Sequence, residues 1–227
     1  MADFTLYLIT DRMQTAGRTL PAVVAEALEG GVRSVQLREK DLPPGELFEL
    51  AVELRAVTRQ YGALLFINDR IDVALAAEAD GVHLGRASMP VRAARRILGR
   101  GMLTGYSAHG VEEALRAERD GADFVTFGPV YDTPSKRSFG PPVGTERLAE
   151  AVHSLTVPVF ALGGISLSNM AGAMESGCHG VALISAIIAA EQPQAASREL
   201  LAAVGRMKSR RSTLLPLSEI SLPQENQ

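Results

Sequence analysis

Eight short apolar segments, about 20 to 30 residues apart, alternate with amphipathic segments along most of this chain. Each apolar segment has the length and the β-branched or aromatic content of a buried strand. The predicted strands are residues 5–10, 34–39, 64–68, 81–85, 103–107, 124–128, 157–163 and 180–185. The predicted helices are residues 20–30, 44–60, 70–79, 90–98, 110–119, 145–154, 166–176 and 185–207. Strict alternation of strands and helices is typical of a parallel sheet covered by helices.

Eight strand–helix units favour an α/β fold, the closed (β/α)8 TIM barrel. The chain has 227 residues, close to the ~250 that such barrels usually contain. The alternative is an open, doubly wound sheet. We expect a single barrel domain over residues 1–211. The segment 212–227, which contains prolines and ends in polar residues, is predicted to be a flexible or peripherally docked tail.

Charge and composition exclude several classes of protein. The net charge is −3, with 23 basic and 26 acidic residues, which is unlike a basic nucleic-acid-binding protein. The single cysteine, Cys178, cannot form an intrachain disulfide and is interpreted as a core residue. No apolar run approaches the ~18 residues of a membrane span, and the first residues do not resemble a secretory signal. We therefore expect a cytoplasmic protein that binds neither nucleic acid nor membrane; whether it forms a homo-oligomer stays open.

The segment "SVQLREK" at residues 34–40 alternates apolar residues with Gln36, Arg38 and Lys40. Successive side chains of a strand point to opposite faces, so these three polar side chains are predicted to share one face. In a barrel the active site lies at the carboxyl ends of the strands. Together with Lys136, the two cations suit a diphosphate better than a single carboxylate.

The third predicted strand ends on Asn68 and Asp69. A carboxylate beside a diphosphate commonly holds Mg²⁺, which bridges the phosphate oxygens and keeps several waters. The alternative is that Asp69 caps the helix that follows. Histidine, cysteine and carboxylate residues do not occur at the spacing of a zinc site, so no zinc is expected.

A second anion site is predicted where the last three strands end. Backbone N–H groups at Gly164, and at Ser185 where the next helix is predicted to begin, could bind a phosphate. The long segment after the sixth strand adds Thr133, Ser135 and Lys136, and loops of that length are often functional. The alternatives are a tight turn that requires glycine and a solvated surface loop.

Two histidines lie near the predicted strand ends. His109 follows the fifth strand and is either a general acid or base, or simply the residue before a helix. His83 lies within the fourth strand and could line the pocket, but a buried, hydrogen-bonded structural role is the preferred interpretation.

Several motifs together resemble the thiamine phosphate synthase family. They are "LYLITDR", "VQLREKD", "FINDRIDVALAAEADGVHLG", "YSAH", "GADFVTFGPVYDTPSK", "PVFALGGI" and "GVALISAI", which occur in this order between about residues 4 and 190. The resemblance implies a (β/α)8 barrel and a transferase of thiamine biosynthesis. It also implies that 4-amino-5-hydroxymethyl-2-methylpyrimidine diphosphate and a thiazole phosphate are joined, with Mg²⁺, to give thiamine phosphate and diphosphate.

The resemblance also implies roles for particular residues. The pyrimidine diphosphate would be bound by Gln36, Leu37, Arg38, Glu39, Lys40, Asn68, Ser107 and Lys136. The thiazole phosphate would be bound by Thr133, Pro134, Ser135, Gly164, Ile184 and Ser185. Asp69 would be a Mg²⁺ ligand. The reaction of the family is dissociative, so positioned cations and the metal stabilise the leaving diphosphate and no strong base is needed.

One position departs from the pattern of the synthases. A second Mg²⁺-binding aspartate usually follows "HLG", and Ser88 stands at that position here. We therefore expect Mg²⁺ with one protein carboxylate fewer than usual. The change is also compatible with a TenI-like thiazole tautomerase, an isomerase in which His109 would be the acid or base. The intact "QLREK" and "NDR" motifs favour the synthase; a non-catalytic binder of a phosphorylated thiamine precursor is the third alternative.

Overall fold

A computed structural model describes residues 3–133 and 141–214, the last five of them by backbone only. Its eight strands are β1 (Leu6–Ile9), β2 (Ser34–Leu37), β3 (Leu64–Asn68), β4 (Gly81–Leu84), β5 (Leu103–Ala108), β6 (Phe124–Phe127), β7 (Val159–Leu162) and β8 (Gly180–Leu183). All neighbouring strands are parallel, and β8 pairs with β1. The closed order β1 to β8 confirms the predicted (β/α)8 barrel and excludes the open sheet.

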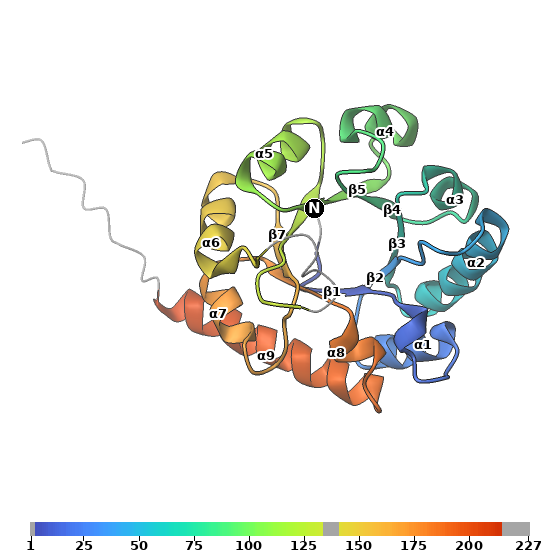
Figure 1. Ribbon diagram of the computed structural model, residues 1–227. Helices are drawn as coiled ribbons and strands as arrows, with labels where there is room; N and C mark the ends of the chain where they lie inside the picture. Colours follow the sequence, from blue (N-terminus) through green and yellow to red (C-terminus); the bar gives the residue numbers. More distant parts are fainter. Residues whose placement is uncertain (1–2, 134–140, 215–227) are drawn as a thin grey trace, which may run out of the picture.

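The helices form a ring around the strands (Figure 1). They are α1 (Leu20–Glu29), α2 (Pro44–Gln60), α3 (Ile71–Ala76), α4 (Val91–Leu98), α5 (Val111–Arg119), α6 (Gly144–Ser154), α7 (Met170–Glu175), α8 (Ser185–Ile188) and α9 (Pro193–Leu214). A short 3-10 helix, η1 (Arg12–Gln14), follows β1. This arrangement leaves the strand ends and their loops as the places where polar side chains can meet.

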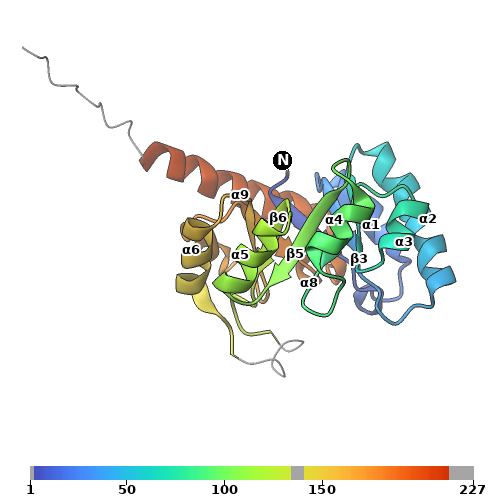
Figure 2. The same cartoon turned by 90° about the horizontal axis from the view of Figure 1, so that it is seen from above.

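The helix predicted at 185–207 is instead two helices, α8 and α9. Pro193 is the first residue of α9, where a missing backbone N–H is tolerated. The same proline disfavours helical conformation at the preceding residue, so the first helix cannot continue through it. Helix α9 packs against α1, α7 and α8 and projects beyond its neighbours (Figure 2).

Helix α9 continues to Leu214, so the expected boundary between residues 211 and 212 falls within it. Residues 215–227, most of the predicted tail, lie outside the described residues. Within the part of the chain that the structure describes, no helix is long and apolar enough to cross a membrane.

Strand β2 ends at Leu37, two residues earlier than predicted. The backbone N–H of Arg38 donates to the side-chain oxygen of Thr10 (2.9 Å) and not to a neighbouring strand. Glu39 is 5% exposed and accepts hydrogen bonds from the Thr10 hydroxyl (2.6 Å) and the Arg12 backbone N–H (3.1 Å). The alternation therefore does not place Lys40 on the inner strand face, since the chain leaves the sheet before it.

Two apolar cores result from the alternation of side chains in the strands. The outer core lies between strands and helices and contains Leu37 and the single cysteine, Cys178. The inner core fills the barrel with aromatic rings, among them Phe4, Tyr7 and Phe124. Phe4 and Phe160 are stacked, whereas Tyr7 and Phe124 pack edge-on with ring centroids 5.4 Å apart. They close one end of the barrel and leave polar side chains toward the carboxyl ends of the strands.

Candidate functional site

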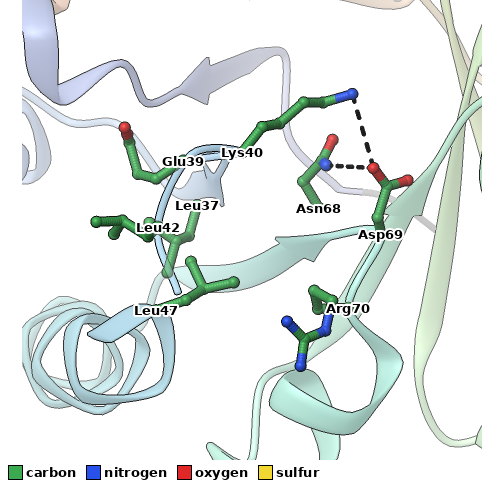
Figure 3. A pocket seen from close by; sticks show the side chains of 8 residues that line it. All are labelled: Leu37, Glu39, Lys40, Leu42, Leu47, Asn68, Asp69 and Arg70. Atoms are coloured by element: carbon green, nitrogen blue, oxygen red, sulfur yellow. Dashed lines mark hydrogen bonds and ion pairs between the residues drawn. The ribbon is translucent and has the colours of Figure 1, made fainter. Parts of the chain in front are cut away.

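Asp69 is the centre of a polar cluster where β3 ends. The amide nitrogen of Asn68 donates to its carboxylate (2.7 Å), and the Lys40 ammonium lies 3.7 Å from the same oxygen (Figure 3). The Ser88 hydroxyl donates to the other carboxylate oxygen. Asp69 does not cap α3, because Arg70 is the cap residue and no side chain completes that cap. The alternative interpretation of Asp69 as a helix cap is therefore wrong.

The backbone at Asp69 is in the left-handed region, with φ of +60°. Aspartate tolerates this conformation better than most residues, although it still costs about 1 kcal/mol or more. Its N–H donates to the His83 carbonyl on β4 (3.0 Å), which fixes the bend. The bend directs the carboxylate toward Lys40 and Ser88 instead of along the strand.

Ser88 occupies the position beside Asp69 where the resemblance expects a second aspartate. Its hydroxyl oxygen accepts a hydrogen bond from the Gly85 N–H (2.6 Å), and its own N–H donates to the Gly85 carbonyl (2.9 Å). This tight turn holds the hydroxyl against the Asp69 carboxylate. A carboxylate at this position would reach the same place.

The residues around Asp69 fit a magnesium ion. Carboxylate, hydroxyl and amide oxygens are hard ligands of the kind that Mg²⁺ prefers, and Mg²⁺ completes its shell with water and phosphate oxygens. In residues 3–133 and 141–209 no group of three histidine, cysteine or acidic residues forms a ready metal site. The Asp69 carboxylate, with the Ser88 hydroxyl beside it, would be the protein's contribution to such a site.

A cavity of about 210 Å³ lies beside this cluster. Its lining residues are Leu37, Glu39, Lys40, Leu42, Leu47, Asn68, Asp69 and Arg70. Lys40 and Asn68 both point toward Asp69, whereas the Arg70 guanidinium is bound to Asp72 (2.8 Å) (Figure 3). The Lys40 side chain is 57% exposed, so its ammonium can leave the ion pair with Asp69 and contact an anionic ligand instead. Leu37 contributes an apolar wall, since it faces the outer core.

The inner face of the barrel carries a hydrogen-bonded polar group on top of the aromatic core. Gln36 donates from Nε2 to the Tyr7 hydroxyl (3.2 Å), which lies 3.3 Å from His83 Nδ1. His83 Nε2 lies 2.9 Å from Ser107 Oγ, and Ser107 Oγ lies 3.0 Å from Thr126 Oγ1. Tyr7 and Thr126 thus contact residues of the candidate site, although neither is among the residues expected from the sequence. The alternation within β1 and β6 places both inward and could have identified them.

His83 is buried and hydrogen bonded, which confirms the preferred interpretation. Glycine at position 105 makes room for it, because a Cβ there would lie 2.5 Å from His83 Nδ1. Burial lowers the pKa of His83 to about 3; the Asp69 charge opposes this shift and the Arg38 charge adds to it. His83 is therefore neutral near pH 7.

The predicted phosphate site brings together the chain after β6 and the end of β7. The Tyr131 N–H donates to the Gly163 carbonyl (3.1 Å). Gly164 has φ of +65°, and a Cβ at this position would lie 2.6 Å from the Asp132 carbonyl oxygen. Only glycine fits both the conformation and the close approach. Asp132 therefore packs against Gly164, and Thr133 is the residue that follows Asp132 in the chain.

The rest of this predicted site is described in part. Ile184 immediately precedes α8, and Ser185 is its first residue and is exposed. Because α8 has only four residues, its dipole adds less to anion binding than the predicted long helix would. Pro134, Ser135 and Lys136 lie outside the described residues.

His109 lies at the end of β5, between the two predicted anion sites. Its Nδ1 donates to the Gly128 carbonyl (2.6 Å), and its backbone N–H donates to Glu113 (2.9 Å). Since a carbonyl only accepts hydrogen bonds, the ring hydrogen is on Nδ1. Nε2 of this exposed ring is then the atom that could exchange a proton.

Comparisons with known proteins agree with this geometry. The family described as "Thiamine monophosphate synthase" matches residues 6–187. A Geobacter sulfurreducens protein, provisionally named thiamine-phosphate synthase, is 58% identical over 200 residues, which are 88% of this chain and 94% of that protein. The thiamine-phosphate synthase of Chloroflexus aurantiacus is 44% identical over 90% of this chain and 94% of its own.

A solved structure shares both fold and sequence with this chain. It is a thiamine phosphate pyrophosphorylase from Pyrococcus furiosus, with a TM-score of 0.83, 40% identity, and coverage of 90% of this chain and 96% of its own. Similarity at this level extends over most of the chain. The chain therefore belongs to the thiamine monophosphate synthase family.

Proposed function

We propose that this protein is a thiamine-phosphate synthase. It would join 4-amino-5-hydroxymethyl-2-methylpyrimidine diphosphate to thiazole phosphate and release diphosphate. The observation that carries the proposal is the cluster of Lys40, Asn68, Asp69 and Ser88 beside an open cavity. A cation and a metal-competent carboxylate in one place suit a diphosphate leaving group.

The reaction breaks the bond between the pyrimidine methylene carbon and the diphosphate oxygen. Negative charge grows on the diphosphate, and Lys40 and Arg38 stabilise it. The methylene carbon becomes cationic, and the thiazole nitrogen supplies the electron pair for the new carbon–nitrogen bond. No proton transfer is needed at the reacting carbon, which fits an inner group whose histidine is neutral. The protein's main contribution is to position two ligands and stabilise charge.

Mg²⁺ would be held by Asp69, with the Ser88 hydroxyl beside it. Bound there, the ion would neutralise charge on the diphosphate oxygens. Asn68 orients the Asp69 carboxylate, because its amide donates to one of the two oxygens. The backbone bend at Asp69 presents the other oxygen to Ser88.

The thiazole phosphate would bind at the second anion site. The N–H groups around Gly164 and Ser185 supply donors, and Thr133, Ser135 and Lys136 come from the chain after β6. The contact between Gly164 and the Asp132 carbonyl supports this arrangement, since it joins the two segments. The single, buried Cys178 is compatible with a cytoplasmic location for this synthase.

A thiazole tautomerase remains the alternative, supported by Nε2 of His109, which has no hydrogen-bond partner among the described residues. One experiment separates the two activities. The purified protein is incubated with both phosphorylated substrates, with and without Mg²⁺, and separately with the thiazole phosphate carboxylate. We expect Mg²⁺-dependent formation of thiamine phosphate, reduced at least ~100-fold in Asp69→Asn. Metal-independent isomerisation that is lost in His109→Asn, without thiamine phosphate formation, would contradict the synthase and support the tautomerase. Ligand binding without either reaction would support a binder.

A matched variant controls for the change of charge in Asp69→Asn. Asparagine also tolerates the left-handed conformation, so the backbone bend is preserved. Asp72→Asn removes a neighbouring carboxylate that is bound to Arg70 and not to the cluster. We expect this control to retain thiamine phosphate formation.

A further inference from the structure

A continuous chain of hydrogen bonds connects Gln36 to Ser107 through the barrel interior. It runs from Gln36 Nε2 to the Tyr7 hydroxyl (3.2 Å), on to His83 Nδ1 (3.3 Å), and from His83 Nε2 to Ser107 Oγ (2.9 Å). We call these four residues the inner relay. Its two ends are predicted pyrimidine-binding residues. Its two middle members, Tyr7 and His83, have no role in the synthase reaction described above.

Each middle member of the inner relay has one hydrogen to share. Burial raises the pKa of the Tyr7 hydroxyl well above its ordinary value, so this group keeps its hydrogen. Both ring nitrogens of the buried His83 face hydroxyl groups, and among the described residues neither faces a carboxylate, which favours the neutral imidazole with a single N–H. A neutral imidazole donates from one nitrogen and accepts at the other. The direction of the hydrogen bonds at one end therefore dictates their direction at the other.

The hydrogen bonds of the inner relay can run in two directions. In the structure the Gln36 amide nitrogen faces Tyr7, which corresponds to the first direction. Tyr7 then donates to His83 Nδ1, the imidazole hydrogen lies on Nε2, and His83 donates to Ser107. Gln36 then has its carbonyl oxygen left to accept a hydrogen bond. Ser107 has its hydroxyl hydrogen left to donate one when Thr126 is the donor in the 3.0 Å contact between their two hydroxyl groups. In the reverse order Gln36 would offer a donor and Ser107 an acceptor. In both orders the two ends offer opposite hydrogen-bonding groups.

Two observations favour the first order. Nε2 of His83 has two hydroxyl oxygens near it, those of Ser107 at 2.9 Å and Thr126 at 3.4 Å, which suits an N–H at this position. Arg38, two residues after Gln36 in the chain, brings a positive charge to this end of β2, and such a charge favours an amide oxygen over an amide N–H at the barrel mouth. Gln36 is 1% exposed, and in the described part of the chain the structure gives its carbonyl oxygen no hydrogen-bond partner. A ligand that donates to this oxygen would satisfy it.

We propose that Tyr7 and His83 are positioning residues that make the site select a 4-aminopyrimidine over the corresponding 4-oxopyrimidine. This inference rests on the proposed function. The edge of a 4-aminopyrimidine offers an amino donor next to a ring-nitrogen acceptor, which complements the Gln36 oxygen and the Ser107 hydroxyl. The edge of the 4-oxo compound is reversed, with a carbonyl acceptor next to a ring N–H. It would place acceptor against acceptor and donor against donor.

The decisive variant is Tyr7→Phe. It keeps the ring that packs among Phe66, Phe124 and Phe160, and it removes only the hydroxyl that couples Gln36 to His83. Without this coupling the Gln36 amide can turn over independently of the His83 hydrogen. The site of this variant can then meet the edge of either pyrimidine. Tyr61→Phe is the matched control, because its hydroxyl is bound to Glu29 on the surface.

The experiment measures kcat/KM for the 4-amino and the 4-oxo pyrimidine diphosphates in the parent protein and both variants. We expect the preference for the amino compound to fall at least about tenfold in Tyr7→Phe, since polar sites built for one hydrogen-bonding pattern reject the mismatched ligand strongly. The preference should be unchanged in Tyr61→Phe. If Tyr7→Phe slows both compounds equally, or changes neither, the proposal is overturned.

Two further measurements keep the inference separate from the proposed function and from folding. Affinities of the two diphosphates, measured by calorimetry, test the selection without turnover. A parent protein that prefers the amino compound in a Tyr7-dependent way, yet forms no thiamine phosphate, would refute the synthase and support the inner relay. The ¹⁵N shifts of labelled histidine, with His83 assigned by its loss in His83→Gln, should report the hydrogen on Nε2. A hydrogen on Nδ1 in the parent protein would overturn the proposal.

Discussion

The hydroxyl of Ser88 donates a hydrogen bond to the carboxylate of Asp69 and so joins the chain after β4 to the end of β3. A residue that departs from the family pattern thus remains in contact with the proposed metal ligand. Serine in place of aspartate removes one negative charge from the cluster but keeps a hydrogen-bond contact with Asp69. The first prediction follows from this contact.

Ser88→Asp should lower the Mg²⁺ concentration that gives half-maximal thiamine phosphate formation. The introduced carboxylate would lie against Asp69, where Mg²⁺ gains a second charged oxygen ligand. Titration of activity with Mg²⁺ checks this. Ser154→Asp, at an exposed position on α6, adds the same charge elsewhere and should leave the requirement as it is. An identical Mg²⁺ requirement in Ser88→Asp would show that the serine does not limit metal binding.

Lys40→Gln should reduce kcat/KM for the pyrimidine diphosphate about 10- to 100-fold. The ammonium is exposed and lies 3.7 Å from Asp69, the proposed metal ligand. Its loss removes a charge-assisted contact that grows stronger as the diphosphate leaves. Steady-state kinetics at fixed ionic strength measures the change. Arg59→Gln, which removes a surface cation paired with Glu78, should stay within about twofold of the parent protein; an equal effect of both variants would rule out a local role.

Gly164→Ala should raise KM for the thiazole phosphate more than KM for the pyrimidine diphosphate. The added Cβ meets the Asp132 carbonyl at 2.6 Å and forces the chain after β6 away from β7. Gly62→Ala is the matched control: its φ of +60° resembles the +65° of Gly164, and a Cβ there has nothing within 4 Å. Equal shifts of KM in both variants would assign the effect to backbone conformation alone.

His83 should make the protein less stable as the pH falls. Its pKa is about 3 in the folded protein, against an ordinary value of 6.5. Between these values the unfolded chain binds a proton that the folded protein excludes. The free energy of unfolding should therefore drop below about pH 6.5, by at most ~1.4 kcal/mol per pH unit from this residue. Urea unfolding near pH 7 and near pH 5 should show a smaller difference in His83→Gln.

His153→Gln is the control for this measurement, because His153 is exposed on α6. It should keep the pH dependence of the parent protein. If His83→Gln also keeps it, the folded protein does not hold His83 neutral through burial.

The sequence predicted the barrel well because periodicity and repeat number are local signals. It missed the end of β2, since the interactions that end this strand come from Thr10 and Arg12, more than 20 residues away along the chain. The split between α8 and α9 could have been predicted from Pro193, which the helix assignment did not take into account.

The candidate site was predictable at the level of strand ends. Asn68 and Asp69 meet Lys40 as the barrel rule implies, although Lys40 lies in a turn after β2 and the alternation of that strand does not place it. The hydrogen bond between Ser88 and Asp69 and the inner relay were not predictable. Both depend on which side chains of different strands lie at the same height, and this is set by barrel register and not by spacing along the chain.

The packed aromatic rings of the inner core fill one end of the barrel, so the barrel is open to ligands at the other end. A ligand that reaches Gln36 and Ser107 must pass every group that lines the opening above them. Under the proposed function we therefore expect the ligand bound deepest to bind first and to leave last. The expected order of binding thus depends on the five aromatic rings of the inner core, which take no part in the chemistry themselves.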